Sequence, residues 1–151
     1  MHRSDRDGMR RLRELSGLRI AGGEMNRELH EFRDLIHDRC LDVLQPDATL
    51  VGGLTGLRSV ARMASEAGVA FTPHTWGNGI GVLANAHLAA GAGDGSYLEF
   101  PFDPPEWGLE RRDFVLERPF DVDADGWVML EDKPGLGCVL NEELLARTRL
   151  G

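Results

Sequence analysis

The sequence lacks the features that would assign it to a membrane, nucleic-acid or disulfide-bonded class. No apolar stretch approaches the roughly 18 residues of a membrane span, and residues 1–5 contain no apolar core of the signal-peptide type. The 17 Lys and Arg are outnumbered by 25 Asp and Glu, and a net charge of −8 argues against non-specific binding to nucleic acid or anionic membranes. The two cysteines, Cys40 and Cys138, share no metal-ligand spacing and are expected to be free thiols. We therefore predict a cytoplasmic protein with no nucleic-acid or membrane partner.

Four short apolar runs each end in, or contain, an ionisable residue. These residues are Glu24, Asp47, His74 and Glu99, at intervals of 23, 27 and 25 residues. An interval of this length accommodates one strand, one helix and two turns. A β/α barrel carries its chemistry at the carboxyl ends of its strands, so the spacing predicts consecutive barrel units that share one site. A complete barrel takes about 250 residues, and the 151 residues of this sequence predict part of one.

Helical and strand patterns alternate before Pro101 and then stop alternating. The predicted helices cover residues 5–16, 27–39, 54–67 and 79–91, and the predicted strands cover 18–21, 41–45, 69–72 and 96–100. This order predicts a parallel sheet. In the later segment we predict two strands, at 114–122 and 127–130, joined by a turn at 123–126. A final helix is predicted at 141–147. We therefore predict an α/β chain, a partial TIM barrel over residues 1–102 followed by a C-terminal hairpin tail over residues 103–151.

Asp47 and His74 form the most informative pair of polar residues. His74 stands in a loop rich in glycine, which permits close approach of a ligand. If the two residues lie on adjacent strands, the Asp47 carboxylate orients the imidazole and stabilises its protonated form, as a base for proton abstraction requires. The alternative interpretation is a loop histidine beside a turn-forming aspartate.

Two glutamates each have two interpretations. Glu24 follows a pair of glycines and is either a carboxylate ligand for a hard cation such as Mg²⁺ or a solvated loop residue. Glu99 lies between Leu98 and Phe100. If it is buried, its neutral form donates a hydrogen bond to a developing oxyanion, and if it faces outward it forms a salt bridge.

Several stretches of the chain, in this order, resemble the C-terminal half of the barrel domain of the enolase superfamily, in its mandelate racemase/muconate lactonizing enzyme type. They cover residues 19–24, 42–47, 52–55, 73–76, 98–101 and 132–137. The resemblance implies that the chain contains strands five to eight of that barrel. It implies Glu24 as the third carboxylate ligand of a Mg²⁺ ion, and Asp47 with His74 as an Asp–His dyad in which His74 is the base.

The same resemblance implies a pocket and a reaction. Glu99 would hydrogen-bond an enolate, and Trp76 and Asn78 would line the substrate pocket. The shared chemistry is abstraction of a proton α to a carboxylate, which needs both a placed base and neutralisation of developing charge. The function implied is a Mg²⁺-dependent acid-sugar (hydroxy acid) dehydratase acting on a small-molecule carboxylate such as a sugar acid. A racemase or epimerase of the same superfamily is an alternative.

The resemblance also identifies residues that this sequence lacks. In such families two further metal carboxylates and an opposite-face lysine lie on strands two to four, after a capping domain. We therefore expect Met1 to be an internal methionine of a longer ancestor and residues 103–151 to return toward the missing capping domain. A non-catalytic alternative follows, a truncated fragment or half-barrel association module. Because four strands leave two unpaired sheet edges, we expect a homo-oligomer or a complex with the missing N-terminal half.

Overall fold

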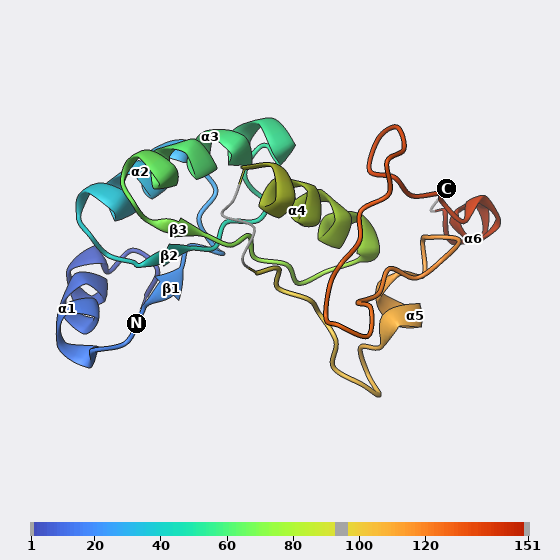
Figure 1. The fold of residues 1–151 in the computed structure, drawn as a ribbon, viewed down its shortest axis with the longest axis horizontal. Coiled ribbons are helices and arrows are strands. Elements are labelled where there is room, and N and C mark those ends of the chain that lie inside the picture. Colours follow the sequence, from blue (N-terminus) through green and yellow to red (C-terminus); the bar gives the residue numbers. More distant parts are fainter. Residues whose placement is uncertain (1, 93–96, 150–151) are drawn as a thin grey trace.

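Short parallel strands alternate with helices through the first part of the chain (Figure 1). The computed structural model describes residues 2–92 and 97–149. Within them the strands are β1 (Ala21–Gly22), β2 (Val43–Leu44) and β3 (Ala70–Phe71), and the helices are α1 (Arg6–Ser16), α2 (Leu29–His37), α3 (Gly53–Glu66), α4 (Gly79–Ala92), α5 (Leu109–Arg112) and α6 (Glu142–Thr148). The strands pair in the order β1-β2-β3, with Ala21 opposite Val43 and Val43 opposite Ala70. The predicted α/β class is confirmed.

Local signals in the sequence set the ends of the helices. The Asp5 side chain accepts a hydrogen bond from the backbone N–H of Gly8 (2.9 Å) at the start of α1, and Gly17 ends α1 in the left-handed region with φ +67°. The Glu31 carboxylate accepts from the backbone N–H of Glu28 (3.0 Å) at the start of α2. None of the helices in the described ranges is both long and apolar enough to cross a membrane.

The larger of two hydrophobic clusters lies between the sheet and the helices α2 and α3, which cover one of its faces (Figure 1). Its buried members include Phe32, Leu35, Leu44, Leu57, Val60, Ala64, Phe71 and Leu88. Full burial of a side chain of this size stabilises the folded state by about 1.5–3 kcal/mol relative to exposure. This cluster therefore fixes the positions of the three strands, and of the loops that follow them, relative to one another.

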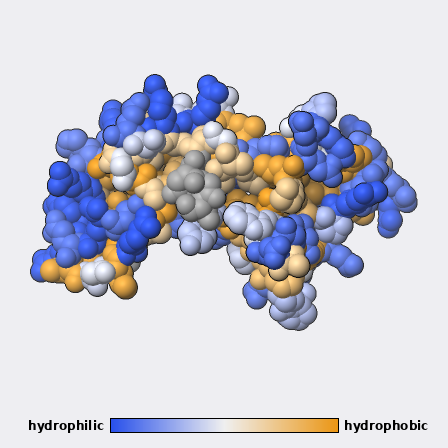
Figure 2. All heavy atoms as spheres, viewed as in Figure 1, coloured by the Kyte–Doolittle hydropathy of each residue, from blue (hydrophilic) through white to orange (hydrophobic). Residues whose placement is uncertain are grey.

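A second cluster joins α4 to the C-terminal segment. Leu83 of α4 is buried with Val115 and Leu116, and the ring nitrogen Nε2 of His87 lies 3.2 Å from the carbonyl oxygen of Leu136. Because α4 packs on α3 on one side and on this segment on the other, it is apolar nearly all round. Figure 2 shows apolar surface gathered toward the middle of the molecule, with a further apolar patch at the lower edge of the end that carries α1.

Asp42 connects α1 to the sheet. One carboxylate oxygen accepts from the backbone N–H of Ile20 (2.8 Å), just before β1, and the other accepts from Nε of Arg13 in α1 (2.6 Å). The Ile20 N–H, followed by the Arg13 guanidinium, holds the pKa of Asp42 below its ordinary value. The carboxylate therefore stabilises the fold in its ionised form.

The predicted fourth strand at 96–100 is wrong over its described part, because residues 97–100 form no strand; residue 96 lies outside the described residues. Two donors that a neighbouring strand would need are missing. Pro73 has no backbone N–H, and the N–H of Thr75 donates to the Glu99 side chain (2.7 Å).

The predicted hairpin tail is corrected in the same way. The expected strands at 114–122 and 127–130 do not form, although the turn between them does, with Oδ1 of Asp123 accepting from the N–H of Trp127 (2.8 Å). The reason lies in a buried ion pair. Asp113 accepts from the N–H of Phe120 (2.7 Å) and Arg112 donates to the Phe120 carbonyl, so both backbone groups that a β ladder would use are occupied.

Candidate active site

The loops that follow β1, β2 and β3 bring three of the predicted residues to one edge of the sheet. Glu24 comes two residues after β1, Asp47 three residues after β2 and His74 three residues after β3. Because the strands are parallel, their carboxyl ends meet at the same edge. Side chains that are 23 to 50 residues apart in the sequence therefore become neighbours.

The imidazole of His74 lies between two carboxylates. Its Nδ1 is 3.1 Å from Oδ2 of Asp47, and its Nε2 is 3.5 Å from Oε2 of Glu24. The Asp47 side chain is 6% exposed, His74 18% and Glu24 56%, so the three form a gradient from the interior to solvent. A proton on Nδ1 satisfies the buried Asp47 carboxylate and leaves the lone pair of Nε2 directed toward the exposed side. This is the geometry of an imidazole base oriented by a carboxylate.

Asp47 is fixed by hydrogen bonds that do not involve His74. Its Oδ1 accepts from the backbone N–H and the hydroxyl of Thr49 (2.8 and 2.9 Å) and from Nδ2 of Asn85 (3.0 Å). The N–H of His74 donates to the carbonyl of Pro46 (3.0 Å), which ties the two loops together beyond the last paired residues of β2 and β3. Sequence reasoning missed Thr49 and Asn85. The signal that indicates Asn85 is an amide in the middle of an otherwise apolar helix.

Glu99 points back toward this edge. Its Oε2 accepts from the backbone N–H of Thr75 (2.7 Å), the residue after His74, and it forms no ion pair with the described residues. The interpretation as an outward-facing salt bridge is therefore wrong. Glu99 and His74 are connected through a single backbone amide, which brings the Glu99 carboxylate to the loop that carries His74.

The two predicted pocket residues have different surroundings. Trp76, two residues after His74 in the chain, is 55% exposed. Asn78 uses its Oδ1 to accept from the N–H groups of Ile80 and Gly81 (3.1 and 3.3 Å), so it caps the first turn of α4. Its side-chain oxygen therefore has a structural partner, and only its amide nitrogen remains for a substrate.

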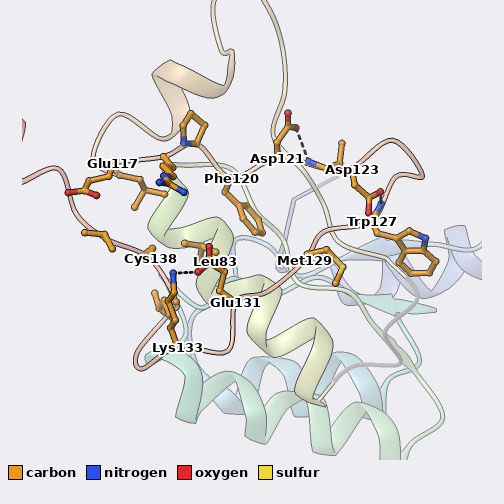
Figure 3. A pocket seen from close by; sticks show the side chains of 17 residues that line it. Leu83, Glu117, Phe120, Asp121, Asp123, Trp127, Met129, Glu131, Lys133 and Cys138 are labelled. Atoms are coloured by element: carbon orange, nitrogen blue, oxygen red, sulfur yellow. Dashed lines mark hydrogen bonds and ion pairs between the residues drawn. The ribbon is translucent and has the colours of Figure 1, made fainter.

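A cavity of about 490 Å³ lies elsewhere, in the C-terminal segment (Figure 3). Its lining comes from Leu83 and from residues 116–139, and Glu131 and Lys133 form an ion pair beside it. The strand-end side chains are not part of this lining. The candidate active site therefore lies apart from this cavity, at the edge of the sheet.

The arrangement of an α/β chain with ionisable groups at its strand ends has known counterparts. Residues 1–144 match the family model described as Enolase C-terminal domain-like. The chain belongs to this family. Its structural neighbours are members of the mandelate racemase/enolase superfamily, so the predicted membership is confirmed.

Sugar-acid enzymes are among the relatives of this family member. It is 32% identical over 136 residues to the D-galactonate dehydratase of Pectobacterium atrosepticum, covering 89% of this chain and 36% of that protein. It is 28% identical over 148 residues to the D-galactarolactone cycloisomerase of Agrobacterium fabrum, covering 95% of this chain and 39% of that protein. The solved 3,6-anhydro-D-galactonate cycloisomerase of Zobellia galactanivorans superposes with a TM-score of 0.85 at 31% identity, over 97% of this chain and 40% of that one. The chain thus spans well under half the length of each.

Members of the superfamily depend on Mg²⁺, which makes the donor set of this chain informative. Glu24 supplies one exposed carboxylate, a ligand type that Mg²⁺ prefers. Within residues 2–92 and 97–149, however, no three His, Cys, Asp or Glu side chains are grouped so that they could hold a metal ion. The described residues can therefore supply one Mg²⁺ ligand, but they do not form a complete magnesium site.

Proposed function

We propose that this chain supplies the base side of an active site that removes the proton α to the carboxylate of a sugar acid, in an acid-sugar dehydratase. The observation that carries the proposal is the His74 imidazole, bonded through Nδ1 to the buried Asp47 carboxylate with Nε2 at the exposed edge of the sheet. The names of the relatives, which include D-galactonate, D-gluconate and arabinonate dehydratases, support a sugar-acid substrate.

In the proposed reaction His74 is the base. The lone pair of Nε2 takes the α proton, the electron pair of the broken C–H bond moves into an enediolate, and the imidazolium that forms is stabilised by Asp47. In a dehydratase the bond from the β carbon to its hydroxyl then breaks. The proton on Nε2, or a second acid, converts the departing hydroxyl into water, so that protons and electrons balance.

Other side chains have supporting roles in this proposal. A protonated Glu99 would donate a hydrogen bond to the enediolate oxygen through the carboxyl oxygen that Thr75 does not contact. Trp76 would cover one side of the substrate, and Asn78 would offer its amide nitrogen. Glu24 would be one Mg²⁺ ligand, and the other ligands would come from outside the described residues.

The proposed function also implies how the chain is divided into segments. We infer that residues 1–102 correspond to a half barrel of the family fold, with β1, β2 and β3 as three of its strands, and residues 103–151 to the segment that returns toward a capping domain. In support of this division, the second segment has its own hydrophobic cluster, in which Val115 and Leu116 are buried against Leu83 of α4. A homo-oligomer or a complex with an N-terminal half would cover the open edges.

A cycloisomerase or racemase of the same superfamily is the second candidate, and two of the relatives are named as cycloisomerases. Both candidates begin with α-proton removal, so His74 has the same role in each. They differ in the product, because a dehydratase releases water and an isomerase leaves the mass of the substrate unchanged. Mass spectrometry of the product separates them.

The test is a chimera in which residues 1–144 replace the matching stretch of the Pectobacterium atrosepticum D-galactonate dehydratase. We expect the chimera, given galactonate and Mg²⁺ in D₂O, to exchange the α proton and release water. His74→Gln should lower both rates by about 10²–10⁴-fold, the usual contribution of a general base. His87→Gln is the matched control, since His87 contacts Leu136 and not the site.

A chimera that is folded by circular dichroism but exchanges no proton would overturn the proposal, as would exchange that is insensitive to His74→Gln. The 151-residue chain alone is a separate arm of the experiment. We expect no Mg²⁺-dependent turnover from it, because its described residues supply only one metal ligand. Turnover that is lost in Glu24→Gln would contradict that expectation.

A further inference from the structure

Asn85 is a fully buried amide in the middle of α4. Its relative exposure is 0%, and its neighbours in the helix, Ala84 and Ala86, are apolar. Burying an amide without partners costs about 2–7 kcal/mol, depending on the reference state. A residue of this kind persists in a helix when its hydrogen bonds are made to specific groups, and those groups indicate its role.

The partners of Asn85 all lie in the loops that carry the candidate base. Its Nδ2 donates to Oδ1 of Asp47 (3.0 Å) and to the backbone carbonyl of His74 (2.9 Å). Its Oδ1 accepts from the backbone N–H of Ala48 (2.9 Å). A backbone N–H only donates and a carbonyl only accepts, so the surroundings fix which end of the amide is oxygen and which is nitrogen. We call these three hydrogen bonds the Asn85 bridge.

The Asn85 bridge determines which oxygen of Asp47 is available to His74. Oδ1 receives three donors, two from Thr49 and one from Asn85, and this leaves Oδ2 as the acceptor for Nδ1 of His74. The same amide group also binds the His74 backbone. Asp47 and His74 come from different loops, and both are thus hydrogen-bonded to the same side chain of α4.

We propose that Asn85 is a positioning residue that holds Asp47 and His74 in register and thereby keeps the His74 ring in the Nδ1–H tautomer, with the lone pair of Nε2 on the side that faces Glu24. The hydrogen bonds that Thr49 donates reach only the Asp47 side chain, whereas those of Asn85 reach both loops. The bridge itself is independent of the function proposed above, and its consequence for catalysis rests on that function.

The test observes the ring directly, by long-range ¹H–¹⁵N NMR of the ¹⁵N-labelled chain. The spectra are recorded over a series of pH values and compared at the alkaline end, where the ¹⁵N shifts of the ring no longer change with pH. The chain contains five histidines, and the signals that disappear in His74→Gln identify the ring of interest. In the unsubstituted chain we expect an N–H-type shift at Nδ1 and a lone-pair-type shift at Nε2.

Asn85→Leu and Asn85→Ala remove all three hydrogen bonds of the Asn85 bridge. The first retains most of the volume and the second is the best helix former, so the proposal does not depend on the folding of a single variant. In both we expect the Nδ1–H population to fall and an Nε2–H form to appear. In the chimera described above, Asn85→Ala should lower kcat by about 10²-fold with little change in KM, the usual result of a misplaced reacting group.

Two control variants separate positioning from other effects. Thr49→Val removes one donor to the same Oδ1 of Asp47 but leaves both loops connected, and we expect it to retain the Nδ1–H tautomer. Val60→Ala reduces the packing of the larger cluster without touching the site, and it controls for a general loss of stability.

The outcomes are decisive whether or not the chain turns over. The proposal is overturned if the unsubstituted chain already shows the Nε2–H form, or if the Asn85 variants keep the Nδ1–H form. It is also overturned if Thr49→Val changes the ring as much as Asn85→Leu does, because the effect would then come from the charge of Asp47 and not from the link between loops. A changed tautomer in an inactive chimera would support the bridge and count against the proposed function alone.

Discussion

Replacing Arg112 with methionine tests how the C-terminal segment is held. Arg112 has no exposed surface and donates from Nε and Nη2 to the two oxygens of Asp113 (2.7 and 2.6 Å). It also donates to the carbonyls of Pro101 (3.2 Å) and Phe120, and its guanidinium lies 4.2 Å from the centre of the Phe100 ring. Arg112→Met therefore leaves one buried carboxylate without its partner and two carbonyls without their donor.

The magnitude follows from the groups left behind. Removing one partner of a buried ion pair destabilises a protein by about 3–5 kcal/mol. We expect a value near the lower end, about 3 kcal/mol, because Asp113 keeps the N–H of Phe120 as a donor and methionine fills much of the space. A typical domain has only about 5–15 kcal/mol of stability, so this single change removes a large fraction of it.

The double variant Arg112→Met with Asp113→Asn makes the prediction specific to the pair. It removes both charges, and the amide oxygen of the new asparagine still accepts from the N–H of Phe120. We expect the double variant to recover about 1–2 kcal/mol relative to Arg112→Met, because contacting residues show coupling energies of about 0.5–3 kcal/mol. Additive effects of the two substitutions would contradict a directly coupled pair.

The assay is urea unfolding at neutral pH, followed by tryptophan fluorescence. Trp107 and Trp127 lie in the C-terminal segment and Trp76 lies beside the candidate site, so single-tryptophan versions report the two regions separately. A loss below about 1 kcal/mol in Arg112→Met, the range of an exposed ion pair, would refute the reasoning.

Two further predictions concern stability. The N–H of Ile20 lowers the pKa of Asp42 in the folded state, so the ionised carboxylate stabilises the fold above its unfolded pKa, and this stabilisation is lost as the pH falls through the folded pKa. Asp42→Asn should therefore reduce the loss of folding free energy between neutral and acidic pH, measured by urea unfolding over a series of pH values. An unchanged loss would contradict the assignment. A methyl group added at Gly79 would lie 2.5 Å from the Asp113 carboxylate, so Gly79→Ala should lower the free energy of unfolding by about 1–3 kcal/mol in thermal unfolding. Gly91 lies on the same helix with open space around it, and Gly91→Ala should raise the free energy of unfolding by up to about 1 kcal/mol. Equal effects of the two substitutions would refute the packing argument.

The sequence predicted the elements whose signals are local. The amphipathic periods of α1 to α3, the apolar run of α4 and the glycines and prolines between them placed these helices within a few residues of their observed bounds. The strand-end positions of Asp47 and His74 follow from the strand order, and the structure places the two side chains in contact. Their catalytic roles stay predictions.

Long-range contacts account for what the sequence did not predict. Asn85 binds residues 37 and 38 positions earlier in the chain, and no local pattern specifies those partners. The expected strands around 123–126 carry real β propensity, but Arg112 and Asp113 capture the backbone of Phe120 before a ladder can form. In both cases hydrogen bonds from a buried polar side chain to distant backbone groups determine the local structure, and local secondary-structure propensity does not.

The two-sided packing of α4 has a consequence for how this chain can be recombined with its relatives. One part of the helix carries Asn85, which fixes the loops at the sheet edge, and another carries Leu83, which packs on the C-terminal segment. A crossover between Ala48 and Leu116 would combine a helix from one parent with loops or a tail from the other. Productive breakpoints in a shuffled library are therefore expected before Asp47 or after Leu140, with the stretch between them inherited as one block.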